Sequence, residues 1–223
     1  MILERAAAAA KAVLDRTRGR APDPASAELL VDASAPEDAR LHAARRLGLS
    51  PGEPAAVAAV EAGGPVIFAG TPPPFAGRAG IGPATPVLSL PWSWQAARVA
   101  LRFAAEGTEE DPGPAIVQYG ELGALALLAD VGDQSELPDV RALDHAAAAA
   151  PWMLSTLRAA ADAISLRAAA TALRLHHSTL QDRITQAEHL LGWSLREPSG
   201  RLRLQLALAL RRLARHRVRI APA

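Results

Sequence analysis

Apolar and polar residues follow a helical period over the first 50 residues. In residues 37–47 the apolar side chains recur on one side of an expected helix, and the arginines lie mostly outside that side. Asp23 followed by Pro24 predicts a helix start, and Ser34 with Glu37 predicts a capping box before a helix that ends at Gly48. We therefore predict packing helices over residues 1–50.

From Ser50 onward the helical period gives way to short apolar runs bounded by Pro and Gly. Runs of this length predict short strands, here at 55–60, 65–70, 86–90 and 116–119. Helical spacing predicts a helix over 94–105 and a second, apolar helix over 122–129. The Pro-rich stretch 71–82 predicts an irregular surface loop. Residues 51–135 thus have the pattern of an α+β region with a small sheet.

A segment rich in turn-forming and charged residues, 132–139, precedes a C-terminal part that reads as entirely helical. We place a domain boundary in this segment and predict an all-α domain over 136–223, which makes the chain helix-rich overall. The last segment, 201–220, alternates Arg and Leu at its start and fits a strand as well as a helix. As a helix it would have an apolar stripe at Leu202, Leu206, Leu210 and Leu213, and a basic end at Arg211, Arg212, Arg215, Arg217 and Arg219.

Composition narrows the function classes. The chain has no Cys, which excludes disulfides, thiolate zinc sites and cysteine nucleophiles. Residues 1–20 lack the apolar core of a signal peptide, and no stretch approaches the ~20 apolar residues that cross a bilayer. We therefore expect a cytoplasmic protein that has no membrane partner.

The net charge of +1 conceals a strong asymmetry along the chain. Residues 1–150 hold 12 basic and 19 acidic residues, whereas residues 151–223 hold 12 Arg and four acids, a balance of +8. A compact basic segment is typical of a surface that binds a polyanion. The alternative is a solvated helical surface, and charge alone does not separate the two.

The chain contains no recognisable catalytic motif. Gly80-Ile81-Gly82 begins like a dinucleotide-binding fingerprint, but Pro83 follows and Thr85 stands where the third Gly is needed. A phosphate-binding Gly-Lys-Ser/Thr loop, a Gly-x-Ser-x-Gly elbow and a His-Glu-x-x-His pair are all missing from the sequence. We therefore predict a protein that is not an enzyme and that has no metal site or cofactor.

Residues 165–192 have the pattern of two helices joined by a tight turn. Ser165 predicts the cap of a helix over 166–173, and a second helix from His177 or Ser178 to Leu191 would end at Gly192. About three residues join the two helices, and Ala169 and Ala170 offer the small side chains that such a corner needs. The pattern predicts a helix-turn-helix.

The second of these helices has two distinct faces. Leu180, Ile184, Ala187 and Leu191 form an apolar stripe. The opposite face carries short polar groups that can hydrogen-bond to base edges or phosphates. The candidate DNA contacts are His177, Ser178, Thr179, Gln181, Asp182, Arg183, Thr185 and Gln186, with Arg167, Arg174 and Arg201 as further phosphate contacts. A polar-faced element of an ordinary helical bundle would have the same pattern.

Residues 154–213 resemble the C-terminal helix-turn-helix of the PucR/CdaR family of bacterial transcriptional regulators. The matching features are Thr156-Leu157, Ala170 with Leu173, His176-His177-Ser178-Thr179-Leu180, Asp182-Arg183, Leu191-Gly192 and the Leu-rich run 202–213. The resemblance favours a helix for that final run. Upstream, Gly80 to Pro83, Leu90, Ser93 to Ala97, Ala100-Leu101 and the run 117–128 are similar to the degenerate GGDEF-like region of these regulators, which implies a sheet scaffold without cyclase activity over 51–135.

The resemblance implies a transcriptional regulator that binds double-stranded DNA, and we expect it to act as a homodimer. The chain departs from the family at three positions: His177 and Ser178 stand where Arg and Asn are usual, and Asp182 replaces an aromatic residue. Because of these departures, an alternative stays open: the chain is a degenerate family member that works as a protein-interaction module and does not bind an operator. A small-molecule effector is conceivable, although no convergent polar cluster in the sequence identifies its site.

Overall fold

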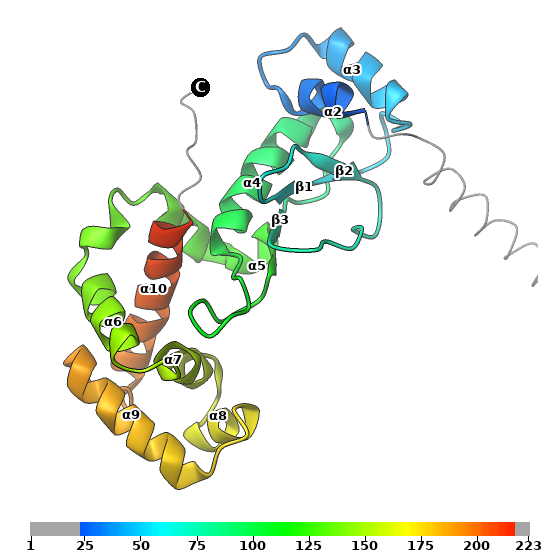
Figure 1. Ribbon diagram of the computed structural model, residues 1–223. Helices are drawn as coiled ribbons and strands as arrows, with labels where there is room; N and C mark the ends of the chain where they lie inside the picture. Colours follow the sequence, from blue (N-terminus) through cyan, green and yellow to red (C-terminus); the bar gives the residue numbers. More distant parts are fainter. Residues whose placement is uncertain (1–22, 217–223) are drawn as a thin grey trace, which may run out of the picture.

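The computed structural model describes residues 23–216, which fold into an α+β part followed by a helical part (Figure 1). Two helices, α2 (Pro24–Val31) and α3 (Glu37–Arg46), lie at one end beside a four-stranded sheet. Five helices form the other end. This arrangement confirms the predicted fold class, an α+β region before an all-α region. Residues 1–22 of the predicted N-terminal helices lie outside the described part.

The N-terminal helix pair begins as the sequence predicts but continues differently. Asp23 caps α2, because its carboxylate accepts from the Ser26 amide at 3.2 Å and from the Ser26 hydroxyl at 2.7 Å. The predicted capping box of Ser34 and Glu37 is wrong. Ser34 instead donates its hydroxyl and amide to Asp32, and α3 starts after Pro36 without a side-chain cap. The difference arises because the Asp32 carboxylate, two residues away, competes with the start of α3 for hydrogen bonds with Ser34.

The sheet has the order β2-β1-β3-β4 and consists of short strands. These are β1 (Ala56–Val60), β2 (Val66–Phe68), β3 (Ala79–Ile81) and β4 (Ile116–Gln118). β1 pairs antiparallel with both β2 and β3, whereas β3 and β4 are parallel. A parallel pair needs a crossover connection, which α4 (Leu90–Phe103) supplies by packing on β1 and β3. The sheet and α4 are therefore one packing unit.

β3 corrects the prediction of an irregular loop over 71–82. A Cβ atom at Gly80 would overlap the Ala97 carbonyl oxygen, and one at Gly82 would overlap the Ser93 carbonyl oxygen, both in α4. The Gly-Ile-Gly sequence thus lets a central strand and a helix approach each other closely, which requires residues without side chains at these two positions.

Two further element predictions in this region are wrong. Residues 86–90 do not form a strand, because Val87–Ser89 form a 3-10 helix and Leu90 begins α4. The predicted helix over 122–129 is divided into α5 (Tyr119–Leu122) and a 3-10 helix, Gly123–Asp130. Gly123 adopts a φ of 51°, in the left-handed region, and so interrupts the α-helix at this point.

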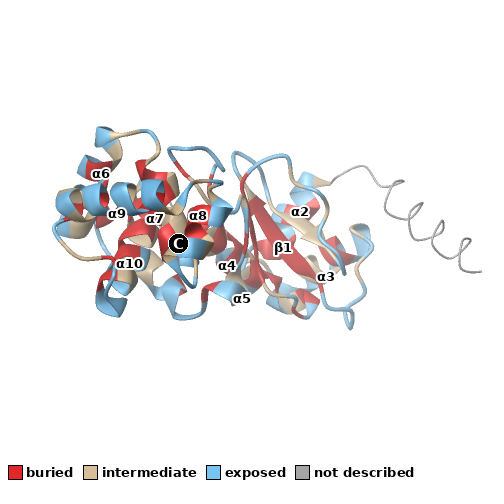
Figure 2. Cartoon of the chain, turned by 90° about the horizontal axis from the view of Figure 1, so that it is seen from below, coloured by how far each residue is buried: buried red, intermediate tan, exposed pale blue. Residues whose placement is uncertain are grey.

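The C-terminal part consists of five helices around one apolar core. They are α6 (Pro138–Ala149), α7 (Met153–Asp162), α8 (Leu166–Ala172), α9 (His177–Leu191) and α10 (Pro198–Arg215), and a 3-10 turn, Gln134–Glu136, precedes them. The residues coloured as buried gather where these helices face one another (Figure 2). Met153, Leu157, Leu180, Ile184 and Leu204 are completely buried there. The same core includes Leu143 of α6 and Ala169 of α8, so all five helices contribute to it.

The structure shows that residues 198–215 form a helix, in which Leu213 of the predicted stripe is completely buried but the rest of the buried side differs from the prediction. Leu202 is 57% exposed, and Leu204, Ala207 and Leu208 face the core instead. Arg211 and Arg212, predicted to lie on a solvated basic end, are buried. Arg217 and Arg219 lie outside the described residues. The reason for the difference is that α10 packs against α6 and α7 and also against α4 (Figure 1). Leu204, Ala207 and Leu208 belong to the core of the helical part, whereas Leu213 near the end of α10 belongs to the core that includes α4.

Across residues 23–216, none of the helices combines the length and the apolar character that a bilayer crossing requires.

Candidate nucleic-acid interface

α8 and α9 meet at a tight turn. Ser165 caps α8 by accepting from the Ala168 amide at 3.2 Å, as predicted. The chain then reverses through Arg174, whose φ of 55° lies in the left-handed region. The Leu175 amide donates to the Ala170 carbonyl at 2.9 Å and closes the turn. The predicted helix-turn-helix geometry is thus present.

α9 has well-defined ends. His176 is its N-cap residue, and the Nδ1 atom of that ring lies 2.7 Å from the Ser178 hydroxyl and accepts from the Ser178 amide at 3.4 Å. At the other end Gly192 adopts a φ of 82° and donates its amide to the Glu188 carbonyl at 2.9 Å. This confirms the predicted stop, because a left-handed Gly is the usual way to end a helix.

The buried side of α9 is the predicted apolar stripe. Leu180, Ile184 and Ala187 are completely buried and Leu191 is 5% exposed. The stripe packs in the core shared with α6, α7 and α8. Because the stripe fixes the rotation of α9 about its axis, it also determines which residues face solvent.

The opposite side of α9 is polar and open. Its exposed residues are Ser178, Thr179, Gln181, Asp182, Thr185, Gln186 and His189. We call this set the α9 outer face. Two predicted contact residues, His177 and Arg183, are half-buried at its edge. The side chains that the sequence predicts as base contacts therefore lie together on one surface, with the exception of these two.

Arg183 has a specific packing partner that the sequence did not reveal. Its guanidinium carbon lies 4.6 Å from the ring centroid of Trp152, the residue before α7. A cation over an indole face at this distance makes a favourable cation–π contact. The stacking holds Arg183 against the flank of the domain, so the guanidinium is positioned before any ligand arrives.

The remaining predicted arginines come from three different segments of the helical part. Arg167 on α8 and Arg174 in the turn are exposed, and Arg201 in the first turns of α10 is half-buried. The structure adds Arg196, which sequence reasoning missed. Its guanidinium lies 3.5 Å from the Thr185 hydroxyl and 3.6 Å from the Glu188 carboxylate. The only signal for Arg196 in the sequence is its position shortly after the end of α9.

Residues 153–210 match the family model of the PucR C-terminal helix-turn-helix domain. The match runs from the start of α7 into α10 and so contains both helices of the turn and the whole α9 outer face. It supports a DNA-binding transcription regulator of PucR type. It does not extend to the upstream part of the chain, so the GGDEF-like resemblance there is unsupported and remains a prediction. No curated protein and no solved structure matches the chain.

Arg211 and Arg212, just after the matched residues, link the helical part to the α+β part. The Arg212 side chain in α10 donates to the Asp111 carboxylate at 3.0 Å, to the Phe103 carbonyl at 3.3 Å and to the Pro112 carbonyl at 2.5 Å. Next to it, Arg211 donates to the Glu110 carbonyl at 3.2 Å, in the α+β part, and to the Asp144 carboxylate of α6 at 2.7 Å. Since α10 belongs to the helical part and Asp111 to the loop after α4, the network fixes one part against the other.

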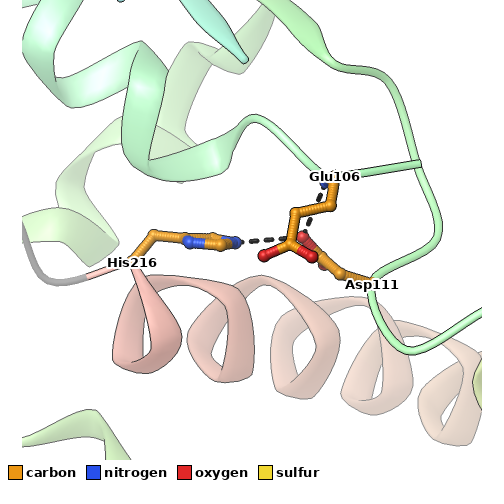
Figure 3. Close-up of side chains that lie close together, drawn as sticks. All are labelled: Glu106, Asp111 and His216. Carbon is orange, nitrogen blue, oxygen red and sulfur yellow. Dashed lines mark hydrogen bonds and ion pairs between the residues drawn. The ribbon is translucent and has the colours of Figure 1, made fainter. Parts of the chain in front are cut away.

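Asp111 is the centre of this network (Figure 3). Besides Arg212, it accepts from the Glu106 amide at 2.9 Å and lies 3.0 Å from Nε2 of His216. Burial alone would raise the pKa of this carboxyl, but the hydrogen bond with His216, the Glu106 amide and the charge of Arg212 together hold the pKa below its ordinary value. Asp111 is therefore an ionised carboxylate at neutral pH.

Glu106, Asp111 and His216 also offer atoms within 4.8 Å of one another, a spacing that could hold a metal ion. The donor set does not fit that role well. Arg212 already places a positive charge 3.0 Å from the Asp111 carboxylate, and a divalent cation there would be repelled. The arrangement fits a structural ion pair better than a metal centre.

Proposed function

We propose that the chain is a sequence-specific transcriptional regulator that places α9 in the major groove of double-stranded DNA. The observation that carries the proposal is the α9 outer face, seven exposed polar residues on a helix whose other side is locked into the core of a PucR-type domain. A helix held in this way can enter a groove without rearrangement, and its short side chains bring the helix close to the base edges.

We assign different kinds of DNA contact to different residues of the helical part. Gln181 and Thr185 lie at its centre and are candidates for hydrogen bonds to base edges, where Gln suits adenine. Asp182 would be tolerated next to a cytosine amino group, because that group is a donor. Arg167 on α8 and Arg174 in the turn before α9 are exposed cations and are candidates for phosphate contacts, which position the helix without reading sequence.

We expect the protein to bind DNA as a homodimer. One short helix reads few base pairs, and two half-sites about 34 Å apart multiply the specificity. Light scattering after size-exclusion chromatography, with and without bound DNA, measures the mass directly. A complex that contains a single copy of the chain on its preferred DNA would contradict this part of the proposal.

The experiment that tests the proposal begins by selecting genomic DNA fragments that the purified protein retains. Binding of the selected duplex is then measured by fluorescence anisotropy for Gln181→Ala and Arg183→Ala, with Gln95→Ala, an exposed position on α4, as control. Gln181→Ala should lose about 1–3 kcal/mol of discrimination at one base pair. Arg183→Ala should weaken all sequences alike and lower the salt slope by about one if Arg183 meets a phosphate.

Two results would contradict the proposal. One is the absence of duplex binding by the unaltered protein even at low salt. The other is equal behaviour of the Gln181, Arg183 and Gln95 variants on every sequence, which would mean that the α9 outer face does not contact DNA.

The second candidate function is a protein-interaction module without operator binding. Two observations favour it: Asp182 places a carboxylate in the middle of the face, and the Ser178 hydroxyl is engaged by His176 at 2.7 Å. DNA affinity that is undetectable at low salt, together with retained folding, would support this alternative. For both functions we propose a cytoplasmic protein without catalytic activity.

A further inference from the structure

A pocket lies where the sheet meets the C-terminal end of α10. Its volume is about 330 Å³. The strand β1 and the helix α4 provide its apolar wall, which includes Ala59 and Leu101. Arg215 and His216 at the end of α10 close the other side. The pocket is therefore shared between the α+β part and the end of α10, and none of its lining residues belongs to the α9 outer face.

The pocket has an excess of positive charge. Three arginines line it, Arg78, Arg98 and Arg215, against one carboxylate, Glu61. That carboxylate is already committed, because its oxygens accept from the Arg78 guanidinium at 2.6 and 3.3 Å. Arg78 is itself 9% exposed and spends a further N–H on the Ala104 carbonyl. The charge of the Glu61 carboxylate is therefore balanced by Arg78, and Glu61 does not neutralise the other two arginines.

Arg98 and Arg215 remain available for a ligand. Neither forms an ion pair with any residue between 23 and 216. The guanidinium of Arg98 instead lies 6.0 Å from the ring centroid of Trp94, which also lines the pocket. Two guanidinium groups without carboxylate partners next to a half-buried indole match an anion that has a flat apolar body.

We propose that this pocket binds a small organic anion, with its carboxylate or phosphate group toward Arg98 and Arg215 and its planar body against Trp94. The planar body of the ligand would be buried against the apolar wall, and its anionic group would accept charge-assisted hydrogen bonds from the two guanidinium groups. Such a ligand touches strand β1, helix α4 and helix α10 at once. It is the kind of molecule that could serve as an effector, and its binding can be measured in the absence of DNA.

Isothermal titration calorimetry in a phosphate-free buffer of low chloride tests the proposal. The probes are benzoate, its neutral analogue benzamide, and inorganic phosphate, which has the charge without the planar body. We expect measurable binding of benzoate that is about tenfold or more tighter than that of benzamide, since a hydrogen bond to a charged group contributes about 1.5–3 kcal/mol. Phosphate should bind more weakly than benzoate, because it has no body to bury.

Variants locate the binding in the pocket. Arg98→Gln and Arg215→Gln should each weaken benzoate about tenfold, whereas Arg45→Gln, an exposed arginine on α3 away from the pocket, should leave it unchanged. Circular dichroism confirms that all three variants are folded. The proposal is overturned if benzoate does not bind, if phosphate binds as tightly as benzoate, if benzamide binds as well as benzoate, or if Arg45→Gln has the same effect as the pocket variants. Because no DNA is present, these outcomes are independent of the proposed operator binding.

Discussion

Replacing Asp111 by Ala is the change that most directly tests how the two parts of the molecule are held together. Asp111 is 2% exposed and receives hydrogen bonds from Arg212, the Glu106 amide and His216 at 2.9–3.0 Å. The variant would leave the Arg212 guanidinium buried without its counter-charge. Breaking a buried ion pair in this way typically costs about 3–5 kcal/mol. Arg212 keeps two carbonyl acceptors, Phe103 and Pro112, so we expect a value near 3 kcal/mol.

The assay is urea unfolding followed by circular dichroism, with Asp162→Ala as a matched control. Asp162 pairs with Arg158 at 2.6 Å but is 53% exposed, so its loss should cost less than about 1 kcal/mol. The double variant Asp111→Ala, Arg212→Met should be more stable than Asp111→Ala alone, because it removes the orphaned charge. Equal destabilisation by the two single variants, or no recovery in the double variant, would refute the reasoning.

Two further predictions concern the packing of the sheet and the response to acid. Gly80→Ala should lower the free energy of unfolding by about 1–3 kcal/mol because its Cβ meets the backbone of α4, whereas Gly120→Ala, with open space around it, should change it little; similar urea midpoints for both would contradict this. The pKa of Asp111 lies below its ordinary value of 3.8, so its contribution to stability is complete above that value and is lost as the pH falls through the lower pKa of the folded state. Urea unfolding of wild type and Asp111→Asn from pH 7 to pH 3 should show a shallower loss in the variant, and parallel curves would argue against it.

Local sequence signals were sufficient for the helix-turn-helix. Ser165, the stripe from Leu180 to Leu191 and Gly192 all act within a few residues of their own position, through capping hydrogen bonds, helical period and a left-handed stop. The same holds for the Asp23 cap of α2. These features depend on backbone geometry that neighbouring residues determine, so a single sequence contains them. Once the stripe faces the core, helical geometry alone determines which residues form the α9 outer face.

Tertiary packing decided the rest, because the partners are remote in the chain. Arg211 and Arg212 read as a solvated basic end, yet their carboxylate partners lie 67 and 101 residues away. Strand β3 reads as a loop because its glycines have no strand preference by themselves, and only the close approach of α4 makes them favourable. The stacking of Arg183 on Trp152 and the pocket beside Arg98 depend in the same way on elements that meet only after folding. Local periodicity contains no information about contacts between remote segments. The sequence therefore determined the bounds and the two faces of α9, and only the folded chain determined which residues support it.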